Sequence, residues 1–286
     1  MDTALQRYTA FLKTVELESF SKAAELLQYS QSTISRMIKS LEDEYGVALL
    51  KRSSKKVRLT AEGEALLPYI MDICQTTRLM QERVNALGDL KNGTLRIGVL
   101  TNISTHWLPG VIQRFHQDYP AINYEMLDGD GHSIQTWIAE GRIDCGILPL
   151  PIHDKLDTVS LFSETFFAVL PTNHPLCRRD TLSVSNFADM PFILPEKGGN
   201  TTISDYLSEH GIKPDIRLVT WEDYTVLRMV ESGVGASILS ETILANTHAD
   251  IIAKPLDPPL HRDIVFAAKN IKSAPPLVKR FMDYLG

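Results

Sequence analysis

The 286-residue sequence predicts an α/β chain in three parts: a small helical unit that ends in a basic β-hairpin, a long helix, and an alternating α/β region. Three observations support this prediction. Two helical patterns joined by a short polar connection occupy residues 18–41, and a heptad pattern follows Thr60. From Thr94 onward, strand-like and helix-like patterns alternate. A chain of this length suggests more than one domain.

The first helices are predicted from apolar spacing and capping. Leu5, Tyr8 and Leu12 lie on one face of a first helix. A second helix is expected to begin at Ser21, because its hydroxyl can accept a hydrogen bond from a free amide of the first turn. Phe20 would lie just outside that helix as a hydrophobic staple.

The third helix carries an apolar stripe at i, i+3, i+4 and i+7, from Ile34 to Leu41. Its other side is polar: Ser32, Arg36 and Lys39 lie opposite the stripe, Ser35 lies on its flank, and Gln31 lies near the helix start. Hydroxyls and cations can contact phosphates, and the amide of a glutamine can pair with an adenine edge. The alternative is an ordinary solvated helix face.

A cluster of cations after this helix favours nucleic acid over that alternative. Five of them occur within eight residues: Lys51, Arg52, Lys55, Lys56 and Arg58. Residues 1–60 carry 10 basic and 7 acidic side chains, whereas residues 93–286 carry 16 and 23. Only the N-terminal part should therefore attract phosphate. The order of two helices and a basic hairpin is that of a winged helix-turn-helix, with the helix-turn-helix at about 18–37 of a unit spanning 1–60.

The long helix, within a linker segment 61–92, has the 3.5-residue period of a helix that pairs with another. The predicted dimerisation residues are Leu66, Ile70, Ile73, Met80, Val84 and Leu87. Thr77 interrupts this seam, and Pro68 should bend the helix in its second turn. The alternative is a helix that packs on its own domain. Lys91, Asn92 and Gly93 predict a hinge at the end of the segment.

Residues 93–286 form the α/β region, with a first strand at 94–100, a helix at 107–119 and a strand at 122–127. Two loops contain hydroxyls, amides and free backbone N–H groups before helical patterns. The first contains Thr101, Asn102 and Ser104, and the second contains Asn200, Thr201 and Thr202. Such helix starts bind anions readily, although simple N-capping explains the first loop equally well.

Other classes of protein find little support in the sequence. Catalytic signatures, phosphate-binding loops and metal-ligand spacings are missing, so we expect no enzyme, no cofactor and no metal site. No signal sequence or membrane span of ~20 apolar residues is recognisable. Cys74, Cys145 and Cys177 are widely spaced, which fits buried thiols in a reduced cytoplasmic protein. A redox sensor at Cys177, beside Arg178 and Arg179, is the alternative.

The sequence resembles the LysR-type transcriptional regulators over essentially its whole length. The most specific segment is SFSKAAELLQYSQSTISRMIKSLEDEYGVALLKRSSKKVRLTAEGEALLPY, and looser matches follow in NGTLRIGVL, AEGRIDCGIL, FFAVLPTNHPL and MVESGVGASILSE. The resemblance implies a C-terminal effector domain similar to type-2 periplasmic binding proteins. Lobe I would comprise about 93–161 and 266–286, and lobe II about 162–265, with the chain crossing twice between them.

The resemblance also implies the function and its residues. Gln31, Ser32, Ser35 and Arg36 match the groove-reading positions and Arg52 the wing cation, while we add Lys39 and Lys55 as phosphate contacts. The expected partners are double-stranded promoter DNA, RNA polymerase, a small effector and further copies in a homodimer or homotetramer, with no membrane. Both loops would face the cleft between the two lobes and hold an anionic effector there. Asp130, Trp221 and Asp223 would also line this cleft. The alternative is a solute-binding or enzymatic domain fused to a DNA-binding module.

Overall fold

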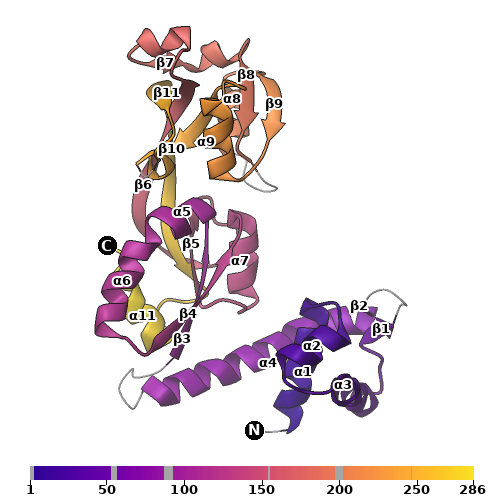
Figure 1. Cartoon of the computed structure of the whole chain (residues 1–286). Helices are drawn as coiled ribbons and strands as arrows, with labels where there is room; N and C mark the ends of the chain where they lie inside the picture. The colour runs from indigo at the N-terminus through magenta and orange to yellow at the C-terminus, as the bar shows by residue number, and fades with distance from the viewer. Residues whose placement is uncertain (1–2, 53–56, 87–92, 154, 197–201, 246) are drawn as a thin grey trace. The chain divides into compact units, whose positions relative to one another are not determined.

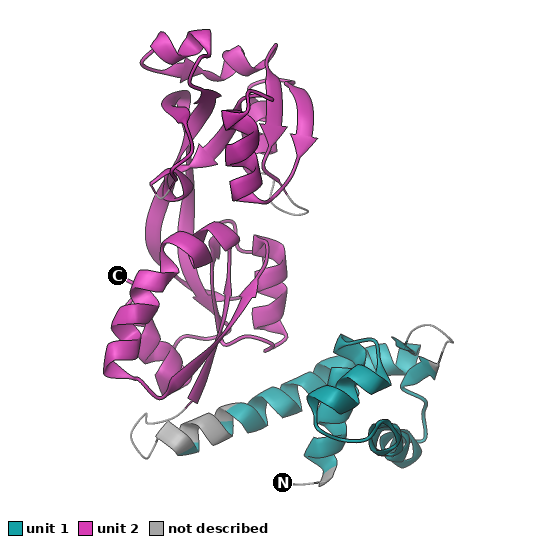
Figure 2. Ribbon diagram, in the orientation of Figure 1, with its two compact units in different colours: residues 1–87 teal, residues 88–286 magenta. Residues whose placement is uncertain are grey.

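The computed structural model describes the chain except residues 1–2, 53–56, 87–92, 154, 197–201 and 246. Two compact units divide it, residues 1–87 and residues 88–286 (Figure 2). The predicted α/β class is confirmed, with a winged helix-turn-helix in the first unit and a two-lobed α/β fold in the second.

Unit 1 contains four helices and one hairpin in its described part (Figure 1). The elements are α1 (Thr3–Glu16), α2 (Phe20–Leu26), α3 (Gln31–Tyr45), β1 (Leu50–Arg52), β2 (Val57–Leu59) and α4 (Ala61–Ala86). Phe11, Ile34 and Leu41 are fully buried in its core, as the apolar stripe of α3 predicts. Polar contacts add to this packing, because Arg7 on α1 pairs with Glu44 on α3 at 2.6 Å.

The start of α2 corrects the sequence prediction. The helix begins at Phe20, and Ser19 is its N-cap, with a hydroxyl that accepts a hydrogen bond from the amide of Lys22 at 3.3 Å. Ser21 therefore lies inside the first turn. Ser19 has the extended backbone that a capping residue requires (φ −154°, ψ 124°), so it can reach the free amides while Phe20 packs against the core of unit 1.

Helix α4 begins with a cap and continues past a proline. The hydroxyl of Thr60 accepts from the amide of Gly63 at 2.9 Å and donates to the carbonyl of Ala48 at 2.6 Å. Pro68 lies in the helix interior without ending it. The described part of α4 thus runs as one helix from Ala61 to Ala86.

Unit 2 is built on a seven-stranded mixed sheet of order β10-β6-β11-β5-β3-β4, with β7 beside β11, and on a smaller β8-β9 sheet. The strands are β3 (Gly93–Val99), β4 (Ile122–Asp128), β5 (Cys145–Pro149), β6 (Asp157–Pro171), β7 (Leu182–Ser183), β8 (Pro191–Leu194), β9 (Asp215–Val219), β10 (Ser237–Ser240) and β11 (Ile251–Ala268). The helices are α5 (Thr101–His106), α6 (Leu108–Asp118), α7 (Gly131–Ala139), α8 (Thr202–Glu209), α9 (Asp223–Glu231), α10 (Glu241–Leu244) and α11 (Pro276–Met282).

Two long antiparallel strands join the lobes. β6 and β11 pair from Ile251 opposite Pro171 to Ala268 opposite Asp157 and run through both lobes (Figure 1). Lobe I packs α5, α6, α7 and α11 around β3, β4 and β5, and lobe II packs α8 and α9 around β8 and β10. Separate apolar cores lie in the two lobes, which is the arrangement the family resemblance implies.

The segment after β3 differs from its prediction. Residues 101–106 form the helix α5 rather than a loop, and α6 begins at Leu108. Leu100 precedes α5 without any side-chain cap, so neither Ser104 nor Thr105 caps this helix. The hydroxyls at Ser104 and Thr105 instead donate to the carbonyl of Thr101, one turn back. These local bonds allow a polar, β-branched stretch to remain helical.

Candidate functional site

Helix α3 presents one polar face to solvent. Gln31, Ser32, Arg36 and Lys39 are exposed, Ser35 is half-buried, and Ile34 and Ile38 are buried on the other side. The N-cap Ser30 accepts from the amide of Thr33 at 3.1 Å, which orders the first turn. This is the turn that meets base edges when a recognition helix enters a groove.

The cations of this face differ in their contacts. Lys39 pairs with Asp43 at 3.3 Å, and both side chains are highly exposed, so this pair contributes little to stability. Arg36 has neither an ion pair nor a hydrogen bond with any described residue. Its guanidinium is therefore free to form a bidentate contact with an incoming base or phosphate.

The hairpin places two cations directly opposite each other. Lys51 on β1 is the cross-strand partner of Arg58 on β2, and both are exposed and without an ion pair among the described residues. Like charges at such positions destabilise a hairpin unless an anion lies between them. Arg52 and Lys55 were also predicted to contact DNA. The Arg52 side chain and all of Lys55 lie outside the described residues. The alternation of inward-facing and outward-facing residues along the two strands would have identified Lys51 and Arg58 as the exposed pair.

Two contacts fix this hairpin, one with α3 and one with α4. Glu42, near the end of α3, accepts hydrogen bonds from the amides of Leu49 and Leu50 at 2.8 and 3.1 Å through one carboxylate oxygen. Gly63 on α4 approaches the carbonyl of Leu49 so closely that a Cβ there would lie 2.2 Å from the oxygen. Helix and hairpin cations are consequently held in one arrangement.

The predicted pairing seam on α4 needs correction at its N-terminal end. Ile70 is buried and Leu66 half-buried in the core of unit 1, because α4 covers α1 there. Farther along, Ile73, Met80 and Val84 are 44%, 60% and 55% exposed. Leu87 lies outside the described residues. The exposed part of the predicted seam thus begins near Ile73, about two turns later than the heptad pattern predicts.

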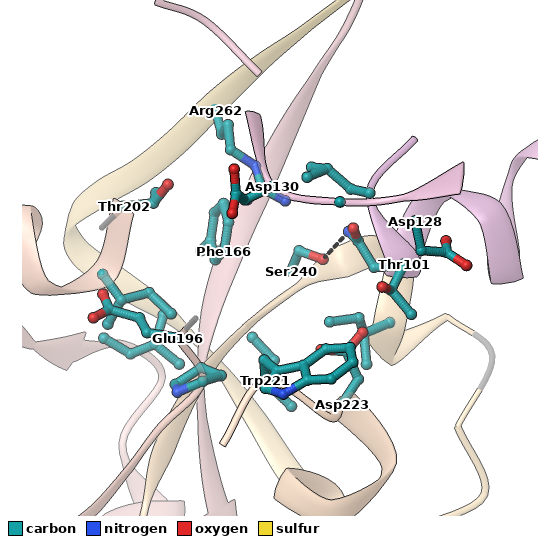
Figure 3. A pocket seen from close by; sticks show the side chains of 18 residues that line it. Thr101, Asp128, Asp130, Phe166, Glu196, Thr202, Trp221, Asp223, Ser240 and Arg262 are labelled. Carbon is teal, nitrogen blue, oxygen red and sulfur yellow. Dashed lines mark hydrogen bonds between the residues drawn. The ribbon is translucent and has the colours of Figure 1, made fainter. Parts of the chain in front are cut away.

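Unit 2 contains a pocket to which both lobes contribute. Thr101 and Asp128 line it from lobe I, and Glu196, Thr202 and Trp221 line it from lobe II (Figure 3). Its empty volume is about 860 Å³, counted out to its open mouth.

A buried ion pair lies at the pocket wall. Glu164 on β6 is fully buried, and Arg262 on β11 donates to one of its oxygens through Nη2 at 2.5 Å and Nε at 3.2 Å. The amide of Asn102 donates to the other oxygen at 2.9 Å. The guanidinium also stacks over the ring of Phe166, 5.0 Å from its centroid. The charge of Arg262 is thereby neutralised inside the protein.

Four carboxylates line the same pocket: Asp128, Asp130, Glu196 and Asp223 (Figure 3). The first three accept hydrogen bonds, from the hydroxyl of Ser104, the amide of Ser133, and the amide and hydroxyl of Ser204.

Asp223 is the exception, since its carboxylate has no hydrogen bond or ion pair with any described residue. Burial raises the pKa of Asp223 to about 6; nearby Arg262 opposes this shift, and Glu164 and Glu222 add to it. A half-buried carboxylate without a partner is a candidate for a functional group.

Only some of the predicted effector-binding residues line the pocket. Thr101, Asn102 and Thr202 line the pocket, although the amide of Asn102 is engaged by Glu164. Ser104 does not line it, which corrects the prediction, because its hydroxyl turns to the Thr101 carbonyl and the Asp128 carboxylate. Asn200 and Thr201 lie outside the described residues. The acidic side chains Asp130 and Asp223 and the indole of Trp221 do line the pocket.

Other kinds of site are missing from the described part of the chain. It holds no group of three or more His, Cys, Asp or Glu side chains arranged for a metal ion. None of its helices is long and apolar enough to cross a membrane. Cys145 is buried, and the half-buried thiol of Cys177 donates to the carbonyl of Pro171 at 3.2 Å.

Comparison with known proteins identifies one family in both units. A family model described as LysR substrate binding domain matches residues 88–286, and one described as bacterial regulatory helix-turn-helix protein, lysR family, matches residues 5–64. The chain is 32% identical to the probable HTH-type transcriptional regulator LrrA of Synechococcus elongatus, across 95% of this chain and 92% of the relative.

Solved structures resemble the whole chain. Full-length OxyR from Pseudomonas aeruginosa is 25% identical with a TM-score of 0.77, covering 100% of this chain and 94% of that one. Full-length CbnR, solved in a complex with its target DNA, is 21% identical with a TM-score of 0.68, covering 100% and 99%. The second likeness is one of fold alone.

Proposed function

We propose a mode of action for this chain, which belongs to the LysR family of bacterial transcriptional regulators. The two domain models of that family match residues 5–64 and 88–286. It is a DNA-binding transcriptional regulator with an effector-binding domain. The relatives are regulators rather than enzymes, and we propose that this chain likewise performs no catalysis. Its place of action would be the cytoplasm, where promoter DNA is found.

We infer that α3 enters the major groove of promoter DNA. The observation that carries this is the unpartnered, exposed Arg36 on a helix whose other face is buried. Arg36 would read guanine and Gln31 adenine, while Ser32, Ser35 and Lys39 would contact bases and phosphates. Arg52 and Lys55 stay predicted contacts of the hairpin, and Lys51 and Arg58 join them in gripping phosphate.

A second copy would complete the DNA reader. Ile73, Met80 and Val84 leave an apolar stripe exposed on α4, and pairing with the same stripe of another chain would bury it. Two recognition helices could then read half-sites about 34 Å apart, one turn of DNA. We propose a homodimer built this way and a homotetramer as a dimer of dimers.

The pocket of unit 2 would hold the effector and give the regulator its signal. A ligand between the lobes can shift the assembly only if it prefers one lobe arrangement. That preference would alter how the paired recognition helices sit on the promoter, and hence the access of RNA polymerase.

A gel-shift assay with the chain's own upstream DNA tests the proposal. Replacing Arg36 by alanine should cost about 1–3 kcal/mol on the specific site and much less on random DNA. The control is Lys13→Ala, which removes a cation already paired with Glu16 at 2.7 Å. An Arg36→Ala protein that kept its full preference for the operator would refute the assignment of α3. Footprints with and without metabolites then test whether unit 2 controls the binding.

A further inference from the structure

We propose that the effector of this pocket carries a positively charged amine, held by the carboxylates that line the pocket in unit 2. The inference rests on the proposed function, because it names the ligand class of the same effector site. It differs from the anionic effector expected from the hydroxyl-rich loops. Three properties of the pocket support it: the charge of its lining, the existing ion pairs and hydrogen bonds of its charged side chains, and its aromatic wall.

The charge of the described lining is strongly one-sided. Asp128, Asp130, Glu196 and Asp223 contribute four carboxylates, and Arg262 is the single cation among the described lining residues. Carboxylates around a partly enclosed space concentrate a negative potential in it, which attracts cations and repels anions. An anionic ligand would have to approach against that potential.

Arg262 offers little compensation to an anion. Both its Nε and Nη2 groups donate to Glu164, whose carboxylate is fully buried. Drawing the guanidinium toward a ligand would leave Glu164 buried with only the amide of Asn102 as a partner. Leaving one partner of a buried ion pair without the other is strongly unfavourable, because the remaining charge is buried and uncompensated. The pair is therefore better regarded as part of the wall than as an anion receptor.

Asp223 is the group that most needs a counter-ion. It lies at the start of α9, half-buried on the pocket wall, without a hydrogen bond or ion pair among the described residues. An ammonium group in the pocket would supply both a charge and N–H donors to this carboxylate. Glu196, which lines the same pocket, already accepts two hydrogen bonds and would contribute mainly its charge.

The remaining wall suits an organic cation. Trp221 lines the pocket and is 42% exposed, so it offers an aromatic surface for an ammonium or its methylene groups. Thr101, Thr202 and Ser240 add hydroxyls, which can accept hydrogen bonds from an amine as well as donate them to an anion. The hydroxyls thus fit either ligand, and the carboxylates decide between them.

A matched set of four-carbon ligands tests this inference on the full-length chain. Putrescine carries two ammonium groups, succinate two carboxylates, and 1,4-butanediol no charge; arginine extends the cationic set. Binding is measured by calorimetry and by the shift in melting temperature, at neutral pH and without DNA. We expect at least one amine to bind, and succinate and butanediol to have no effect.

Two isosteric variants locate the binding. Asp223→Asn should weaken the amine by about tenfold or more, as expected for loss of a charge-assisted contact. Asp215→Asn, which changes an exposed carboxylate paired with Arg217, should leave it unchanged. Three results would each overturn the inference. They are equal binding of the amine by Asp223→Asn and the parent, binding of succinate in preference to putrescine, and no binding of any amine. Because these measurements contain no DNA, they are independent of the gel-shift test of the proposed function.

Discussion

Replacing Asp223 by asparagine should make unit 2 more stable at neutral pH. The parent side chain is a half-buried carboxylate without a partner among the described residues, and burial raises its pKa from 3.8 to about 6. Asparagine has nearly the same shape and cannot ionise. The variant therefore removes the cost of keeping a charge in this position, while the pocket wall stays intact.

The size of the effect follows from the pKa shift. A raised carboxylate pKa means that the folded state holds the proton more tightly, so ionisation destabilises the fold as the pH rises from 3.8 through about 6. At about 1.4 kcal/mol per pKa unit, the full penalty above that range is about 3 kcal/mol. The buried amide of asparagine keeps part of the desolvation cost, so we expect a gain of about 1–3 kcal/mol. For a unit of this size that is a rise of roughly 3–10 °C in melting temperature.

The assay is a series of thermal melts of the full-length chain across pH, following the transition of unit 2. The parent and variant should melt together below pH 3.8, diverge through about pH 6, and stay apart above it. Arg262, Glu164 and Glu222 are the charged groups around Asp223, and the comparison cancels their own titration to first order. Asp215→Asn is the control, because an exposed ion pair contributes little. A variant less stable than the parent at neutral pH, or a difference independent of pH, would refute the reasoning.

Four further changes probe the other contacts. Lys51→Ala should weaken binding to all DNA sequences alike and reduce the salt slope by about 0.9, and an unchanged slope would exclude Lys51 from the phosphate contacts. Glu42→Ala should cost unit 1 about 1–3 kcal/mol by orphaning two amides, whereas Glu42→Gln should cost less; equal melting of both variants would contradict this. Val84→Asp should dissociate the dimer in sedimentation experiments while Val84→Leu preserves it, and a Val84→Asp dimer would place the interface elsewhere. Glu164→Gln should destabilise unit 2 by about 3–5 kcal/mol because Arg262 becomes an unpaired buried charge, which a chemical denaturation curve would detect as a lower midpoint.

Local periodicity predicted the helices of unit 1 better than their ends. The stripe from Ile34 to Leu41 determines which side of α3 is buried, because a helix places these residues on one face. The start of α2 was predicted at the wrong serine, because Ser19 and Ser21 are both able to cap a helix. Ser19 is the N-cap, and Phe20 packs against the core as the first residue of the helix. Ile70 shows the same limit: its heptad position is equally good for a partner helix and for its own domain.

The pocket was harder to predict than the helix face. Thr101 and Thr202 were found because hydroxyls before helical patterns are a local signal. The pairing of Glu164 with Arg262 has no such signal, because the two residues come from strands roughly 100 residues apart that meet only through long-range β pairing. Without that pair, the sequence cannot tell that the cation is already neutralised and that the pocket is acidic.

The pairing of β6 with β11 also has a consequence for the order in which the chain folds. Both lobes depend on β11, so the seven-stranded sheet is not complete until residue 268 has been synthesised. Unit 1 has its own core within residues 1–87 and needs no such late segment. On a ribosome it should fold first, long before the ligand pocket exists. A chain interrupted between the two long strands should therefore still bind DNA but no longer respond to the effector, and nascent-chain gel shifts can follow that separation.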